Sequence, residues 1–280
     1  MTIDENQPGF AEALLRRVVD VRASELRAMV ASFTLFFFLL SSYFVLRPMR
    51  DEVAASSGAS QLAWLFLATL AGTLVFNPMF AALVAKFPVR KFIPISYQFF
   101  VANMLIFYAV LRYMSAAEGS SVDVWAGRAF FIWTTVFALF NTSIFWCLMA
   151  DTFRSDEAKR LFGFIGVGGT LGSISGSAAT AVLAKNVGTM NLLIVSAVLL
   201  EIAVLVVMRF PQRGVIAPEE RVRSKREQDR ELIGGSVWAG FTHVVRSPYL
   251  LGICGFMVLF TVGSTFLYFA QSDLVGREFA

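Results

Sequence analysis

The chain has 280 residues, of which 57% are apolar and 16% are charged, and its mean hydropathy is +0.66. Soluble domains contain about 45–50% apolar and roughly 25% charged residues, so this composition excludes an ordinary soluble protein. The net charge of +4 is spread between apolar blocks, which argues against a nucleic-acid-binding patch. We predict an all-α, polytopic membrane protein whose main partner is the lipid bilayer.

The sequence contains few residues that would bind a metal or cofactor or catalyse a reaction. His243 is the only histidine, and Cys147 and Cys254 lie far apart in apolar blocks, so neither a metal site nor a disulfide framework is indicated. No Gly-Lys-Ser or Gly-Lys-Thr of a Walker A motif occurs. We therefore predict no metal, no cofactor and no enzymatic activity.

Seven apolar segments follow one another along the chain, each about the 20 residues that cross the hydrocarbon core as a helix. They are residues 28–46, 62–85, 92–111, 129–150, 161–184, 187–208 and 249–272. Backbone groups in lipid must bond within their own segment, which predicts helices. A β-barrel would need short strands of alternating polarity, and none is seen in the sequence.

Residues 1–27 do not resemble a signal peptide, because they carry several acidic residues and no apolar core. Phe10, Leu14, Val18 and Val21 recur at helical spacing, which predicts a short amphipathic helix on the membrane face of a cytoplasmic tail. A disordered polar tail is the alternative.

The distribution of Lys and Arg predicts the orientation. Eighteen lie in the tail and in alternate connections on one side, and six lie on the other side. Because basic residues accumulate on the cytoplasmic side, we expect an inner-membrane protein with a cytoplasmic N-terminus.

The connection 209–248 is much longer than the others and strongly charged, which is typical of a solvated linker. Six spans (28–208), a linker and a further span (249–280) resemble the beginning of a two-half transporter of the major facilitator type. This resemblance implies a chain truncated from about twelve spans, with the rest of the C-terminal half as its partner. Retinal proteins and G-protein-coupled receptors are the seven-span alternatives. The last span lacks the lysine that the first class needs, and the predicted orientation opposes the second.

The most informative motif is Leu46–Glu52, which reads Leu-Arg-Pro-Met-Arg-Asp-Glu. On a continued helix Tyr43, Arg47, Arg50 and Asp51 share one face, and Pro48 would remove one backbone bond there. Such a cationic face lining a cavity suits an anionic substrate. The alternative is an interfacial loop with arginines reaching to the surface.

This motif resembles the Leu-Arg-x-x-Lys-Asp signature of the bacterial and plastid ATP/ADP translocases, distant relatives of the major facilitators, with Arg50 where that family commonly has lysine. Glu157–Gly163 and the glycine-rich segment after it resemble a second stretch of the same family. The similarity covers residues 28–280. The loop 86–91 keeps only the final basic pair of the general facilitator motif. The resemblance implies nucleotide exchange, with the Arg47 and Arg50 side chains on phosphate and Asp51 holding an arginine in the empty state.

Gly168, Gly172 and Gly176 form a ladder of small residues in the fifth segment. Such a ladder lets two helix backbones approach closely, so we predict helix packing, with substrate contact as the alternative.

Two isolated charges are further candidates. Glu201 is the only charged residue well inside a predicted span, and it would pair with an arginine, take a proton, bind a cation or serve a structural role. Arg128 begins the fourth segment, as an interfacial anchor or a cavity residue.

We therefore expect a secondary transporter that exchanges ATP, ADP or a similar phosphorylated anion. One alternative is a proton-coupled facilitator for another small organic solute or drug, with Glu201 as the protonation site. The other is a non-transporting scaffold or signalling protein that acts through the charged linker.

The predicted topology is testable with reporter fusions. Fusions at positions 88, 156 and 225 should report a cytoplasmic location and those at 57 and 119 an external one, because the basic residues flank the first set. A cytoplasmic signal at 119 would contradict the assigned spans.

Overall fold

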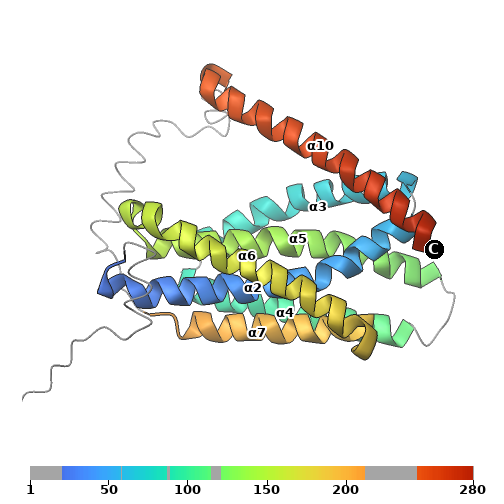
Figure 1. The fold of residues 1–280 in the computed structure, drawn as a ribbon, viewed down its shortest axis with the longest axis horizontal. Helices are drawn as coiled ribbons and strands as arrows, with labels where there is room; N and C mark the ends of the chain where they lie inside the picture. Colours follow the sequence, from blue (N-terminus) through green and yellow to red (C-terminus); the bar gives the residue numbers. More distant parts are fainter. Residues whose placement is uncertain (1–20, 58, 87–88, 115–120, 212–244, 280) are drawn as a thin grey trace, which may run out of the picture. The chain divides into compact units, whose positions relative to one another are not determined.

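The computed structural model describes residues 21–57, 59–86, 89–114, 121–211 and 245–279 (Figure 1). The helices in these ranges are α2 (Ala23–Ser57), α3 (Ala59–Lys86), α4 (Val89–Met114), α5 (Ser121–Thr152), α6 (Ser155–Val187), α7 (Leu192–Met208) and α10 (Pro248–Phe279). A short 3-10 turn, η1 (Thr189–Asn191), precedes α7. No strand occurs in the described ranges, and the all-α prediction is confirmed.

Six of the seven predicted apolar segments fall within one of these helices, whereas segment 187–208 begins at the last residue of α6 and continues through Gly188 and a short 3-10 turn into α7. Six helices are long and apolar enough to cross a membrane, and α3 has a shorter apolar stretch, Gln61–Phe76, within its described residues. The largest difference concerns the first segment, since α2 extends from Ala23 to Ser57 rather than from 28 to 46. The predicted amphipathic segment and most of the predicted linker lie outside the described residues.

Residues of α2 to α7 belong to one compact unit that ends at Pro211, and α10 belongs to a second unit. α10 is an apolar helix whose large side chains, such as Phe256, Leu259 and Phe266, are exposed. Within the first unit, exposed apolar side chains such as Trp64 and Leu74 on α3 suit contact with lipid chains.

Helix α2 lies at the centre of the first unit, where it packs against α5, α6 and α7 (Figure 1). α4 packs against α5 and α7. Aromatic side chains fill these contacts: Phe36 of α2 stacks on Phe145 of α5, with ring centroids 4.1 Å apart. Because α2 is enclosed on several sides, its orientation fixes where its polar residues point.

The helices alternate in direction, so the unit has two ends. At the end where α2 begins, which we call the Glu25 end, Glu25 contacts Arg160 at the start of α6. At the opposite end, which we call the Arg50 end, Arg50 near the end of α2 contacts Phe131 near the start of α5.

The closest approach in the unit is between α2 and α6, at the glycine ladder. A Cβ atom added to Gly168, Gly172 or Gly176 would lie 2.6, 2.2 and 2.5 Å from the backbone oxygens of Phe33, Phe37 and Ser41, respectively. These distances are far below a carbon–oxygen contact, so only glycine fits at the three positions. The ladder lets two helix backbones touch without side chains between them.

Buried hydroxyl groups add hydrogen bonds between α2 and its neighbours α6 and α7. Ser41 donates to the Gly172 carbonyl oxygen at 3.0 Å, and Thr180 lies 3.3 Å from the Val45 carbonyl oxygen. The Ser42 and Ser196 hydroxyl oxygens are 2.8 Å apart across α2 and α7. Measured interhelical hydrogen bonds in membranes contribute about 0.6 kcal/mol on average, so these bonds refine the packing that the ladder permits.

An ion pair closes the Glu25 end of the α2–α6 contact. The Arg160 Nη2 atom lies 3.1 Å from the Glu25 carboxylate, whose side chain is 1% exposed, and the Arg22 backbone N–H donates to the other carboxylate oxygen at 3.0 Å. A carboxylate this deeply buried needs such partners, because desolvation of an unpaired charge is costly.

The ladder predicts a difference between two glycines of α6. Gly172→Ala should lower accumulation and the unfolding temperature, because its Cβ would meet the Phe37 backbone; overpacking typically costs about 1–3 kcal/mol. Gly163→Ala is the matched control, since nothing lies within 4 Å of its added Cβ. Thermal unfolding in detergent measures both. A stable Gly172→Ala protein that has lost transport would instead place Gly172 in the solute path.

The buried ion pair predicts a second contrast. Removal of one partner of a fully buried ion pair costs about 3–5 kcal/mol. Because Arg160 is partly exposed, Glu25→Ala should destabilise the protein by less than this amount. Asp156→Ala should change stability by at most about 1 kcal/mol, because its pair with Arg154 is exposed. Equal unfolding temperatures for the two variants would contradict a structural role for Glu25.

Candidate functional site

The charged motif lies on α2, which remains helical through Pro48 to Ser57. The segment is therefore part of a helix and not a loop. Helical spacing places Arg47 and Asp51 one turn apart, with Arg50 beside Asp51. Two arginines thus meet one carboxylate at the Arg50 end of the unit.

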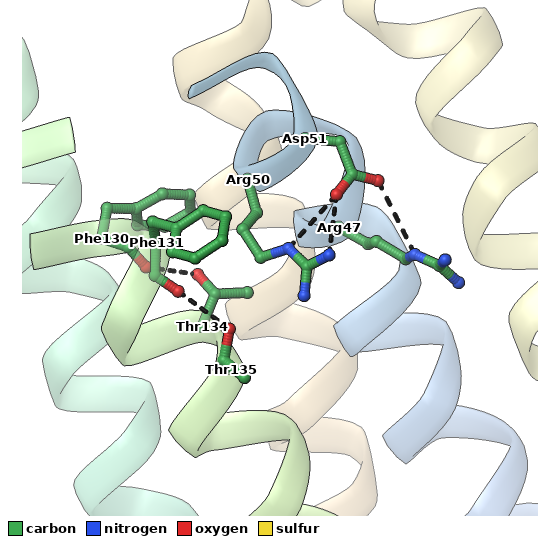
Figure 2. A network of polar contacts seen from close by, with 7 residues as sticks. All are labelled: Arg47, Arg50, Asp51, Phe130, Phe131, Thr134 and Thr135. Carbon is green, nitrogen blue, oxygen red and sulfur yellow. Dashed lines mark hydrogen bonds and ion pairs between the residues drawn. The ribbon is translucent and has the colours of Figure 1, made fainter. Parts of the chain in front are cut away.

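The contacts of Asp51 join both guanidinium groups (Figure 2). Arg50 donates from Nε and Nη2 to one carboxylate oxygen at 3.2 and 2.8 Å, and the Arg47 Nε atom lies 3.7 Å from the other oxygen. The two-point contact with Arg50 is the stronger one, because its two N–H groups converge on a charged acceptor. One negative charge is thereby shared between two positive charges.

The two arginines differ in exposure. The Arg50 side chain is 13% exposed, whereas Arg47 is 44% and Asp51 37% exposed. Arg47 lies over the Phe44 ring at 5.3 Å from its centroid. Arg47 is thus the solvent-facing member of the cluster, and Arg50 is held against protein.

Phe131 of α5 supports the Arg50 side chain. The guanidinium carbon lies 5.3 Å from the centroid of the Phe131 ring, which is almost completely buried (Figure 2). The ring in turn meets Phe66 of α3 edge to face, at 6.1 Å. A cation over an aromatic face is stabilised by about 0.5–2 kcal/mol, more where water is excluded. The ring therefore fixes the place of the Arg50 charge at the seam of α2, α3 and α5.

Two threonines lie below this ring on α5. The Thr134 hydroxyl donates to the Phe130 carbonyl oxygen at 2.8 Å, and the Thr135 hydroxyl donates to the Phe131 carbonyl oxygen at 3.0 Å (Figure 2). Their hydrogens are thus bound to the α5 backbone, and their oxygens keep acceptor capacity. The cations of the cluster come from α2 alone.

Tyr43, predicted on the same face as the arginines, contacts the Phe44 ring at right angles, with centroids 5.2 Å apart. It packs against the apolar core and makes no polar contact with Arg47, Arg50 or Asp51 in the described part of the chain. The structure therefore brings three of the four predicted α2 residues together.

Arg128 and Glu201 lie outside this network. Arg128 donates from Nη2 to the Gln61 side-chain oxygen on α3 at 2.9 Å and lies over Trp125 at 5.0 Å. Glu201 lies on α7, is half-buried, and makes no ion pair or hydrogen bond through its carboxylate with another described residue. The two charges do not pair with each other in the described part of the chain.

Sequence reasoning missed two functional or structural partners. Phe131 is one of many phenylalanines, and only the pairing of α2 with α5 identifies it. Glu25 was assigned to the polar tail, although it begins a buried contact with Arg160. The usable signal was an acidic residue just before an apolar segment, since a carboxylate that becomes buried needs partners.

The arrangement suits reversible binding of an anion. Among the described residues no group of three or more His, Cys, Asp or Glu side chains is placed to hold a metal ion. Two planar guanidinium groups around one carboxylate can instead exchange that carboxylate for a phosphate or carboxylate of a ligand.

Comparison with known proteins yields one match. The sequence model of a family described as the Major Facilitator Superfamily matches residues 27–276. No curated protein and no solved structure matches the chain.

Proposed function

The chain belongs to the major facilitator superfamily, and on that basis and on the Arg50 cluster we propose that it exchanges anionic phosphorylated solutes, such as ATP and ADP, across the inner membrane. Members of this superfamily are secondary transporters: they are membrane proteins that move solutes, and they are not enzymes. The superfamily match supports the class of protein, and the cluster supports the charge of the solute.

One observation carries the proposal: Arg47 and Arg50 share the single carboxylate of Asp51. The local charge is therefore not balanced by this contact, and Glu52, the next acidic residue, is exposed and makes no ion pair with a described residue. Arginine binds phosphate through two parallel N–H groups, and its weak hydration favours a partly buried site. A phosphate that approaches Arg47 would take over the N–H groups that now contact Asp51.

The same charge balance supports exchange rather than one-way transport. Charge is costly in a low-dielectric surrounding, and a bound anion would offset the positive charge of the two arginines. Reorientation of the loaded protein is then easier than reorientation of the empty one. A carrier of this kind returns most readily with a second anion bound. Such coupled movement of two solutes in opposite directions makes it an antiporter.

Orientation belongs to the proposal as well. The excess of Lys and Arg on one side of the spans supports a cytoplasmic N-terminus, with the Arg50 end toward the opposite face. The proposed partners are the bilayer and a small phosphorylated anion.

A proton-coupled facilitator is the second candidate, and Glu201 is the observation that favours it. It lies inside an apolar helix without a described base partner, and an acidic residue in a membrane span is by default a functional candidate. Proton-driven uptake that survives removal of the Arg50 charge would favour this function.

Replacement of Arg50 tests the proposed exchange. Arg50→Ala should abolish uptake of labelled ATP and ADP while the protein still inserts into the membrane, because the held guanidinium over Phe131 is lost. Arg50→Lys should retain part of the uptake, since the charge remains and the two-point geometry does not. Nucleosides, which lack phosphate, should not compete.

The matched control is Arg112→Ala, at the exposed last turn of α4 and the same end of the unit. It should leave uptake unchanged. Normal uptake by Arg50→Ala would refute the proposed anion site.

A further inference from the structure

The Phe131 ring connects the Arg50 charge to helix α5 (Figure 2). The guanidinium carbon lies over the ring, and the ring is 1% exposed while the Arg50 side chain is 13% exposed. The face of an aromatic ring is negative, so it attracts a cation, and most strongly where water is excluded. This attraction acts on the charge as a whole and uses none of the N–H groups that Arg50 donates to Asp51.

Contacts with α3 and α2 fix the place of the ring. Phe131 meets the Phe66 ring of α3 edge to face, with centroids 6.1 Å apart. About one turn earlier on α5, a Cβ atom added to Gly127 would lie 3.6 Å from the Val53 side chain, so α2 and α5 are in contact beside the ring. A long arginine side chain has many conformations to lose when it is held. A fixed ring can therefore restrict where the Arg50 charge lies.

The contact of Arg47 with Phe44 differs in two respects. The distance from the guanidinium carbon to the ring centroid is the same 5.3 Å in both contacts. Arg47 and Phe44, however, belong to one helix, and the Arg47 side chain is 44% exposed, so water weakens their attraction. The Arg50 contact joins two helices and is largely buried. It can therefore hold its charge relative to a second helix.

We propose that Phe131 is a positioning residue of the anion site and that its aromatic face holds Arg50 in place for the incoming anion. The inference rests on the proposed function and adds a residue of α5 to a site whose cations come from α2. Because the ring binds none of the N–H groups, its attraction persists when they turn from Asp51 to a phosphate. The competing role is ordinary apolar packing, for which the charge distribution of the ring is irrelevant.

The expected effect on anion binding has a definite sign. The ring contacts Arg50 before and after binding, so it acts by raising the fraction of molecules in which Arg50 is already in place. The apparent affinity for a ligand is proportional to the fraction of molecules in the binding-competent state. The attraction of a cation to an aromatic face corresponds to a factor of about two to thirty. Loss of this attraction should therefore weaken anion binding, on this scale.

Fluorination of the ring tests the inference with almost no change of shape. In the full chain, Phe131 is replaced by mono-, di- and trifluorinated phenylalanine, because each fluorine withdraws negative charge from the ring face. The dissociation constant of ATP is measured in phosphatidylcholine nanodiscs. It should rise stepwise with the number of fluorines, by about threefold or more across the series, while the unfolding temperature stays near the parent value.

The same fluorinated series at Phe137 is the matched control. Phe137 is also fully buried on α5, where it stacks on the Trp133 ring, with centroids 5.4 Å apart. Its fluorination should leave the dissociation constant of ATP within about twofold of the parent value. A change at Phe131 that is no larger than the change at Phe137 would show that the ring face does not position Arg50.

Leucine variants separate the ring face from packing volume. Phe131→Leu and Phe137→Leu each remove one buried ring from α5, so both should lower the unfolding temperature. Phe131→Leu alone should weaken ATP binding, and Phe131→Tyr, which keeps an aromatic face, should bind ATP more tightly than Phe131→Leu. Equal ATP affinities for the two leucine variants would make Phe131 a packing residue. If Phe131→Leu does not accumulate, the fluorinated series decides.

The remaining outcomes distinguish this inference from the function on which it rests. ATP binding that Arg50→Ala abolishes and that fluorination of Phe131 leaves unchanged would overturn the positioning role and keep the proposed function. ATP binding that survives Arg50→Ala would overturn both, because the ring acts through Arg50. No binding of ATP by the parent protein would also overturn both.

Discussion

The contact of α2 with α6 is the constraint on which the rest of the unit depends. At Gly172 an added Cβ would lie 2.2 Å from a backbone oxygen of α2, so the two backbones are as close as helices can be. This contact fixes the rotation of α2 about its own axis. With that rotation fixed, Phe36 meets Phe145, Ser42 meets Ser196, and Arg50 reaches the Phe131 ring. A different rotation would move the charged residues off the α5 seam.

Charge is organised differently at the two ends of the unit. At the Glu25 end the buried carboxylate is matched by Arg160 and by a backbone N–H group, which is an arrangement for stability. At the Arg50 end two guanidinium groups share Asp51, and Arg128 binds a neutral amide. A carboxylate held by its own partners offers little to a ligand. Two guanidinium groups around one carboxylate can instead donate to a phosphate that replaces it. The sharing of one carboxylate by two arginines marks the Arg50 end as the candidate site.

The apolar blocks were enough to predict the helices, because lipid leaves the backbone few other choices. The shared face of Arg47 and Asp51 could also be predicted, since it follows from helical periodicity alone. The limits of α2 could not, because hydropathy measures the apolar part of a helix and not the polar turns beyond it. Phe131 and the partner of Glu25 depend on which helices pack together, and periodicity within one segment carries no such information.

The same contacts constrain how the unit moves during transport. If α2 slid along α6, residues of α6 other than glycine would meet the α2 backbone, where only glycine fits. The slide would also separate the Ser41 hydroxyl from the Gly172 carbonyl oxygen. It would also remove Glu25 from Arg160 and expose a buried carboxylate. Each of these changes is unfavourable, so we expect α2 and α6 to move together as one body. Alternating access in secondary transporters uses rocking of one bundle against another, and a rigid α2–α6 pair suits that motion. Arg50 would then travel with its whole bundle, and the site would keep its geometry while its exposure to either side of the membrane changed.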